Sequence, residues 1–180
     1  DMRMNQNQKL DAHYIINNYE EKHLNKILFN YGEIKNSKKI AKKILNTREN
    51  KEITTTNDLI ELLQPIIPIK YENKFLAQIF QAIRIEVNNE IEVLKSFLKQ
   101  ATKSLKTGGR IVCISYHSLE DRCVKRFIQF GNFEGMDEKD FYGNSSRLLK
   151  KVGKLVVPSE KEIKLNKRAR SAKMRIAEKI

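Results

Sequence analysis

Hydrophobic residues recur every three to four positions through most of the chain, a spacing that is typical of amphipathic helices. Residues 10–64 follow it throughout, with one apolar stripe over 24–31 and a second over 34–45. The pattern therefore predicts an all-helical segment at this end of the chain. Lysines 38, 39, 42 and 43 surround the second stripe, either as a solvated face or as an RNA contact.

Residues at the ends of these stripes predict where the helices begin and end. Gly32 is expected to cap the first stripe, since glycine favours the position after a helix. Thr56 is expected to be the N-cap of a further helix, supported by acidic residues in its first turn. Pro65 and Pro68 are expected to end that helix.

The longest periodic stretch covers 73–105, which is long for one globular helix. Asn88 and Asn89 offer a break, and Asn89 with Glu92 has the spacing of a capping box. We expect two helices or one kinked helix. Arg84 and Asn88 share one helical face, either as a surface pair or as the polar lining of a cleft.

Beyond this stretch the period changes. Gly108-Gly109 leads into mostly β-branched or apolar residues over 110–116, which predicts a buried parallel strand followed by a helix over 118–129. Polar residues gather where the strand ends, and the carboxyl ends of strands are where α/β sheets bind ligands. Ser115, His117 and Ser118 are therefore candidate binding residues.

The remaining residues predict shorter elements. Gly, Asn, Asp and Ser over 131–146 indicate a long loop. Residues 148–157 alternate weakly and predict one or two strands, and 158–160 open a short helical turn. Basic or polar residues alternate with small or apolar ones over 167–177, which predicts a strand with one basic face.

Charge points to a polyanionic partner. Lys and Arg number 35 against 22 Asp and Glu, a net charge of +13, which favours nucleic acid, although AT-rich coding bias gives a similar composition. The predicted basic strand is the main candidate, either binding phosphates or protecting a sheet edge with charge. Its cations are Arg168, Arg170, Lys173 and Arg175.

Several other chemistries are disfavoured. His117 and Ser118 are adjacent and lack the G-x-S-x-G turn of a hydrolase, so Ser118 is better interpreted as a helix N-cap with Asp121 completing the box. Two cysteines and three histidines match no zinc pattern, so no metal is expected. No long apolar run or signal core occurs, and a reduced, cytoplasmic protein is expected.

Six motifs occur in order along the chain, and together they are specific. They are Asp1-Met2-Arg3-Met4, Thr54-Thr55-Thr56, the segment 80–88 (FQAIRIEVN), Gly108-Gly109-Arg110, the segment 115–122 (SYHSLEDR) and the segment 168–175 (RARSAKMR). With them the chain closely resembles the bacterial 16S ribosomal RNA (cytosine-N4) methyltransferases, the RsmH or MraW family. That family has Phe where this chain has Tyr116.

The resemblance implies an α/β fold: the C-terminal part of a Rossmann-like S-adenosylmethionine methyltransferase sheet with an inserted all-helical domain. It implies that residues 1–7 are the tail of the first half of the catalytic domain, that 8–72 form the inserted helical domain, and that 73–180 form the last part of the methyltransferase domain. The family's cofactor-binding half precedes the Asp-Met-Arg-Met segment, so no cofactor residues are expected in this chain. The chain begins with Asp1 and is expected to be a fragment that is inactive alone.

The resemblance also implies 16S ribosomal RNA in the small subunit as partner, with Ser115, His117 and Ser118 facing the target base. Candidate RNA-binding residues, from resemblance and charge together, are Arg3, Arg84, Asn88, Arg122, Lys125, Arg168, Arg170, Lys173 and Arg175. Without the first strands, one side of the sheet would be uncovered, which predicts homodimerisation or a partner chain at that edge. The alternative is a stand-alone basic RNA-binding module without catalysis.

Overall fold

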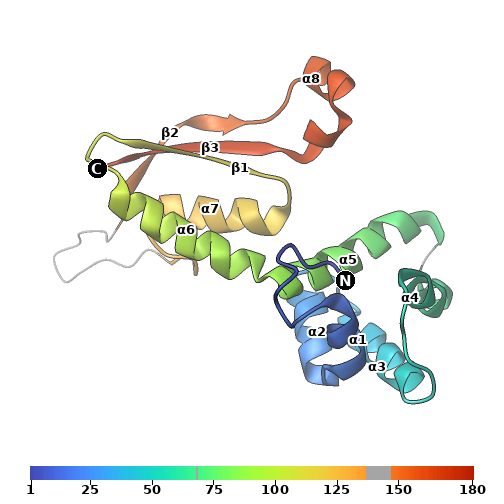
Figure 1. Ribbon diagram of the computed structural model, residues 1–180. Helices are drawn as coiled ribbons and strands as arrows, with labels where there is room; N and C mark the ends of the chain where they lie inside the picture. Colours follow the sequence, from blue (N-terminus) through green and yellow to red (C-terminus); the bar gives the residue numbers. More distant parts are fainter. Residues whose placement is uncertain (68, 137–146) are drawn as a thin grey trace. The chain divides into compact units, whose positions relative to one another are not determined.

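The chain forms two compact units in the computed structural model, which describes residues 1–67, 69–136 and 147–180. Residues Asp1–Glu90 make the helical unit, and Ile91–Ile180 make the sheet unit, whose described residues form helices and three strands (Figure 1). The mixed α/β class is therefore confirmed. None of the helices in the described ranges is both long and apolar enough to cross a bilayer.

The helical unit contains the predicted series of amphipathic helices. These are α1 (Ala12–Asn18), α2 (Glu21–Asn30), α3 (Ser37–Arg48), α4 (Thr56–Leu63), the short 3₁₀ helices η1 (Gln64–Ile66) and η2 (Ile69–Tyr71), and α5 (Glu72–Asn88). Their apolar faces form one buried cluster. Its largest fully buried members are Ile15, Leu24, Leu28, Ile40, Ile44, Leu63, Ile79 and Ile83.

The unit boundary at Glu90 lies later than the predicted boundary between 72 and 73. The reason is α5, whose Ile79, Ala82 and Ile83 are buried in the helical core against the preceding helices. Periodicity alone assigns these residues to a helix but does not say which core they join.

Gly32 has a different role from the one predicted. Tyr31 is the C-cap residue of α2, and Gly32 does not have a left-handed backbone. A Cβ at Gly32 would lie 2.6 Å from the Leu28 carbonyl oxygen and 3.1 Å from that of Gln78. The position therefore needs glycine for a close approach of two backbones, not for a turn.

The N-cap of α4 is Thr55, not Thr56 as predicted. The Thr55 hydroxyl accepts a hydrogen bond from the Asp58 amide at 3.1 Å, and the Asp58 carboxylate accepts one from the Thr55 amide at 2.8 Å. Hydrogen bonds from Thr55 and Thr54 hold the pKa of Asp58 at about 2. A capping box needs the acidic residue three positions after the cap, which selects Thr55.

Thr55→Ala should lower the free energy of unfolding by about 1 kcal/mol, because the substitution removes the capping hydroxyl. Thr56→Ala is the matched control: it removes a hydroxyl from the first helical residue, which is exposed. Urea denaturation followed by circular dichroism measures both variants. Equal destabilisation by the two substitutions would contradict this assignment of the cap.

The long periodic stretch forms two helices, one of the two arrangements expected from the sequence. Between α5 and α6 (Glu90–Ser104), Asn89 has φ +51°, a left-handed backbone that asparagine tolerates better than most residues. Asn89 is thus the C-cap of α5. The predicted capping box with Glu92 is wrong, because an N-cap residue has an extended backbone.

The sheet unit consists of a small antiparallel sheet with helices on one side (Figure 1). Its strands are β1 (Arg110–Ser115), β2 (Leu149–Val156) and β3 (Lys173–Lys179), in the order β1-β3-β2. Apolar side chains of α6 and α7 (Ser118–Phe130) pack against one face of this sheet. That core contains Leu98, Ile111, Val124, Ile128, Leu149 and Ala177.

The prediction of a buried parallel strand over 110–116 is wrong. β1 pairs with β3 antiparallel, and Val112 and Ile114 are 54% and 57% exposed on the face away from the helices. Apolar residues at both alternating sets of positions suggested burial on both faces. β1 is also an outer strand, so one of its edges pairs with no strand among the residues that the structure describes.

The C-terminal elements agree with the prediction only in part. β2 is one strand, and α8 (Glu160–Leu165) follows an N-cap at Ser159, as expected. The predicted basic strand over 167–177 is wrong in its first half, since the 3₁₀ helix η3 (Lys167–Ser171) precedes β3. Part of the predicted loop, 137–146, and Pro68 lie outside the described residues.

Candidate nucleic-acid interface

The turn between β1 and α7 is built around His117 and Glu120. His117 is the N-cap residue, and its Nδ1 accepts a hydrogen bond from the Glu120 amide at 3.4 Å. The Glu120 carboxylate in return accepts from the amides of Tyr116 at 2.9 Å and His117 at 3.3 Å. The predicted cap at Ser118 with Asp121 is therefore wrong, because the Asp121 carboxylate is bonded to β3 instead.

The three residues predicted to face the target base differ in how open they are. Ser115 is buried, and its hydroxyl donates to the Lys173 carbonyl oxygen at 3.4 Å. The His117 side chain is only 10% exposed, whereas Ser118 is exposed in the first turn of α7. Ser118 is therefore the most accessible of the three, and a role for the others requires them to act from within the turn.

Asp121 joins α7 to β3 through a nearly buried ion pair. Its carboxylate accepts hydrogen bonds from Arg175 Nε at 2.7 Å and Nη2 at 3.1 Å, and Lys173 Nζ lies at 3.5 Å. Burial raises the pKa of Asp121, but the hydrogen bond and charge of Arg175 and the charge of Lys173 outweigh it, so the pKa is lowered. Two candidate RNA-binding cations thus already have an acidic partner.

Arg168 and Arg170 lie in η3 and are exposed there. Asn166 Oδ1 accepts a hydrogen bond from the Arg168 amide at 3.1 Å, and Ala169 is buried. This local cap and the buried alanine wind the chain into a 3₁₀ turn, so these two arginines do not continue the basic face of β3. Both remain candidates for phosphate contacts.

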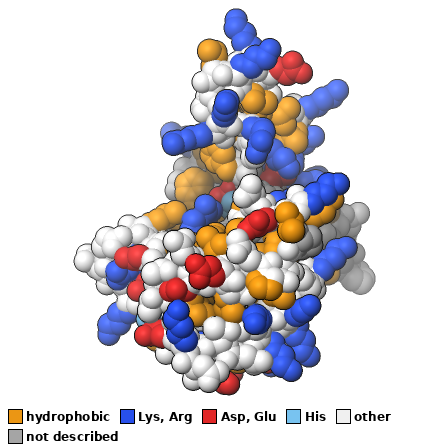
Figure 2. Space-filling view, turned by 90° about the vertical axis from the view of Figure 1, so that its right-hand side faces the viewer, with side chains coloured by type: hydrophobic (Ala, Val, Ile, Leu, Met, Phe, Trp, Pro, Cys, Tyr) orange, Lys and Arg blue, Asp and Glu red, His pale blue; other side chains and the backbone are white. Residues whose placement is uncertain are grey.

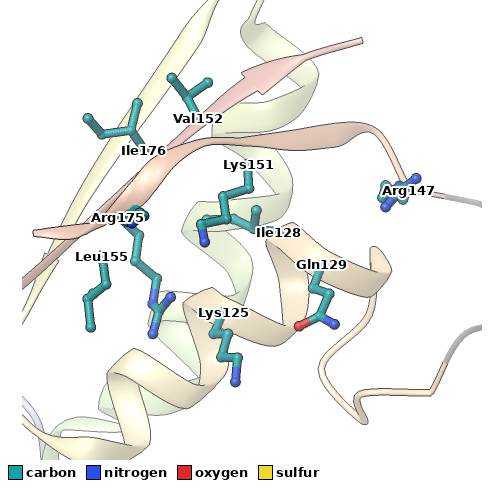
Figure 3. A pocket seen from close by; sticks show the side chains of 10 residues that line it. Lys125, Ile128, Gln129, Arg147, Lys151, Val152, Leu155, Arg175 and Ile176 are labelled. Atoms are coloured by element: carbon teal, nitrogen blue, oxygen red, sulfur yellow. The ribbon is translucent and has the colours of Figure 1, made fainter.

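A cationic pocket of about 360 Å³ lies between α7 and the β2–β3 pair (Figure 3). Cations surround a floor of aliphatic side chains, and none of the described lining residues is acidic. Its cations are Lys125, Arg147, Lys151, Lys154 and Arg175. Cationic side chains around an apolar floor match a phosphodiester with its sugar or base.

A bulge in β2 helps to form this pocket. Gly153 has φ +67°, and the register of β2 against β3 shifts between Val152 and Val156. A bulge changes the direction in which neighbouring side chains project. Lys154 and Leu155, inside the shifted segment, both line the pocket. Lys125 and Arg175 were candidates from sequence, whereas Arg147, Lys151 and Lys154 were missed.

Charge on the face seen in Figure 2 does not single out an interface. Figure 2 shows Lys and Arg side chains distributed over the whole visible face of the molecule. In α3, Lys38, Lys39, Lys42 and Lys43 are all exposed, which fits both a solvated face and an RNA contact. On α7, Arg122 is exposed, as is Lys125 of the cationic pocket.

The candidates in the helical unit are bonded mainly within the protein. Asn88 Oδ1 accepts from the Met4 amide at 2.8 Å, and its Nδ2 donates to the carbonyls of Met2 and Arg84, each at 2.9 Å. Arg3 forms a forked pair with Asp1, and its Nη1 donates to the Gln8 carbonyl oxygen at 2.9 Å. Asn88 therefore fixes the first residues of the chain against α5.

Arg84 forms a forked pair with Glu90, with Nε–Oε1 at 2.8 Å and Nη2–Oε2 at 3.0 Å. Its side chain is 43% exposed and lines an open pocket of about 350 Å³ together with Met2, Met4 and Phe80. Met2 has φ +63°, which is unusual for this residue type and is typical of functional segments when it occurs. Arg84 thus remains accessible to a ligand.

Comparison with known proteins identifies relatives of the whole chain. Residues 1–180 match the model of the MraW methylase family. Curated relatives from Flavobacterium johnsoniae and Christiangramia forsetii, both named "Ribosomal RNA small subunit methyltransferase H", are 56% identical over 180 residues, covering 100% of this chain and 60% of each relative. One of the same name from Bacteroides thetaiotaomicron is 50% identical over 99% of this chain and 59% of its own length. The chain spans about three fifths of the length of these relatives.

Proposed function

The chain belongs to the MraW methylase family, and on that premise we propose that it forms the RNA-binding part of a ribosomal RNA methyltransferase. The whole enzyme transfers a methyl group from S-adenosylmethionine to N4 of a cytosine in 16S ribosomal RNA, near the decoding site. The proposal includes the finer description of the sheet unit as the end of a Rossmann-like sheet and of the helices before it as an inserted domain. It also includes a cytoplasmic location.

The observation that carries the RNA-binding part is the cationic pocket in a chain that matches this family from end to end. Lys125, Lys151 and Lys154 are exposed around it and suit phosphate contacts. Such contacts set the position of an RNA without reading its sequence. An enzyme that draws a target cytosine out of its stack must also hold the RNA strand on both sides of that base.

The residues of this chain do not fit the cofactor by themselves. S-adenosylmethionine is held in folds of this class at the carboxyl ends of parallel strands, beside a glycine-rich loop that leads from a strand into a helix. The sheet unit has only antiparallel pairings among its described residues, and Gly108-Gly109 leads from a helix into a strand. We therefore place the cofactor site in residues outside this chain.

Calorimetric titration of this chain with S-adenosylmethionine should show no binding, because its residues form no cradle for the methyl donor. Addition of the preceding part of a relative such as that from Flavobacterium johnsoniae, expressed as a continuous chain with this one, should restore binding. Micromolar affinity of the chain alone would contradict the proposed division of the site.

The free edge of β1 fits the same division of the enzyme between this chain and a preceding part. Its backbone N–H and C=O groups on that side pair with no strand in the described part of the sheet, and an open edge readily accepts another strand. We propose that it pairs with a strand of the preceding part of the enzyme or, when this chain is alone, with a second copy. A stand-alone RNA-binding module remains the alternative, and it requires a reading frame that begins near Asp1.

A further inference from the structure

The start of the chain forms a loop that is tied to the ends of two helices of the helical unit. We call residues 1–8 the junction loop. The Asp1 carbonyl oxygen accepts a hydrogen bond from the Ala12 amide at 2.9 Å, at the start of α1. Gln8 Nε2 donates to the Val87 carbonyl oxygen at 2.8 Å, near the end of α5. Both ties use backbone groups that a helix leaves unpaired at its ends, so neither helix loses a hydrogen bond.

Asn88 of α5 holds the middle of the junction loop with its side-chain amide. Its Oδ1 accepts a hydrogen bond from the Met4 amide at 2.8 Å, and its Nδ2 donates to the Met2 carbonyl oxygen at 2.9 Å. Nδ2 also donates to the Arg84 carbonyl oxygen at 2.9 Å, which fixes the carboxamide against its own helix. The loop is therefore held on both sides of Arg3 by one side chain that is itself fixed in place.

The backbone conformation that Asn88 holds is strained. Met2 has φ +63°, a left-handed backbone that residues other than glycine and asparagine rarely adopt. Such a conformation persists only where the surrounding contacts enforce it. Arg3 stiffens the same loop, because its Nε and Nη2 donate to the two carboxylate oxygens of Asp1 at 2.6 Å and 2.9 Å. The junction loop thus has one defined conformation that the sequence of the loop alone does not favour.

We propose that Asn88 is a positioning residue for methyl transfer and that it acts through the junction loop. This inference rests on the proposed function, in which the cofactor-binding part of the enzyme precedes Asp1. The junction loop then connects that part to the helical unit, and its conformation sets the direction in which the chain enters. A fixed direction matters because a misplacement of about 1 Å between reacting groups lowers a rate by about 100-fold.

The strain at Met2 favours positioning over the alternative, in which Asn88 only stabilises the fold. The cost of a left-handed backbone is comparable to the net contribution of two hydrogen bonds. The bonds from Asn88 to the loop therefore add little net stability, and their main effect is to define the loop conformation. Packing does not explain that conformation at its outer end either, because the Met4 side chain is 72% exposed.

The test uses the whole enzyme, made by joining this chain to the preceding part of the relative from Flavobacterium johnsoniae. Asn88→Ala should lower kcat for methylation of small ribosomal subunits by about tenfold or more, while both KM values and the stoichiometry of S-adenosylmethionine binding stay unchanged. Trypsin should cleave after Arg3 about tenfold faster, because the released loop opens more often. Mass spectrometry of the products measures that rate. Asn73→Ala, at an exposed asparagine of the same helix, is the matched control and should change neither rate.

A double variant separates positioning from packing. Glycine adopts positive φ about as readily as negative φ, so Met2→Gly removes most of the strain that Asn88 holds. Asn88→Ala, Met2→Gly should therefore recover part of the kcat and of the trypsin resistance that Asn88→Ala loses. If Asn88→Ala lowers the binding stoichiometry, Asn88→Asp replaces it, because this variant keeps the size of the side chain and the acceptor for Met4 but not the donor.

Two results would overturn the role of Asn88 and leave the proposed function intact. One is an unchanged kcat in Asn88→Ala, and the other is a double variant that is slower than Asn88→Ala, because further loss of activity on removing the Met2 side chain indicates packing. Absence of S-adenosylmethionine binding by the unmodified whole enzyme would instead overturn the proposed function and this inference together.

Discussion

Asp121→Ala should lower the free energy of unfolding of the sheet unit by about 3 kcal/mol, the low end of the range for breaking a buried ion pair. The side chains of Asp121 and Arg175 are only 12% and 15% exposed. Removing the carboxylate leaves the Arg175 guanidinium nearly buried without its main partner, and that uncompensated charge is the source of the loss. Chemical denaturation monitored by circular dichroism measures it.

The double variant Asp121→Ala, Arg175→Met is the control for this prediction. Replacing both charges with apolar groups removes the uncompensated charge, so most of the lost stability should return. If the double variant is as unstable as Asp121→Ala alone, then packing of the Asp121 region, and not the ion pair, stabilises the contact between α7 and β3.

The same pair sets a pH dependence with a defined sign. The pKa of Asp121 is lowered in the folded chain from its ordinary value of 3.8. Its contribution to stability is therefore fully present above that value and is lost as pH falls through the lowered pKa. The difference in unfolding free energy between the unmodified chain and Asp121→Asn should be constant near neutral pH and shrink below about pH 4. A difference that grows on acidification would contradict the assignment.

Sequence patterns predicted best what depends on local spacing. The helical series and the break at Asn89 follow from apolar periodicity and from the tolerance of asparagine for a left-handed backbone. Both predicted caps were one residue late, at Thr56 and Ser118. The N-cap of a capping box is the residue with an extended backbone that lies three positions before the carboxylate bonded to its amide. In a polar run, several neighbouring residues have that spacing.

What the sequence did not predict depends on contacts between distant segments. The alternation over 167–177 fits a strand, but the cap at Asn166 and the buried Ala169 divide it into a 3₁₀ helix and β3. The cationic pocket combines Lys125 of α7 with Lys151 and Lys154 of β2. The packing of α7 against the sheet and the bulge at Gly153 bring these residues together, and neither is visible in a local window.

Removing three charges from the cationic pocket should weaken RNA binding by about 100-fold near 0.1 M salt. The triple variant is Lys125→Gln, Lys151→Gln, Lys154→Gln. Each phosphate neutralised on a single strand contributes about 0.7 to the slope of log affinity against log salt, so three lost contacts reduce that slope by about two. Log affinity varies linearly with log salt, so a slope that is lower by two reduces the affinity gained between 1 M and 0.1 M salt by a factor of about 100. Filter binding over a salt series measures both quantities.

The lysine face of α3 supplies the matched control for this experiment. Lys38→Gln, Lys42→Gln, Lys43→Gln removes the same number of positive charges from exposed positions in the helical unit. If phosphates bind at the cationic pocket, this variant keeps the original salt slope, because a general fall in net charge acts only through screened, long-range attraction. An equal loss of slope in both triple variants would mean that RNA is held by charge spread over the whole surface. A loss only in the α3 variant would move the interface to the helical unit, because the salt slope reports where counterions are displaced.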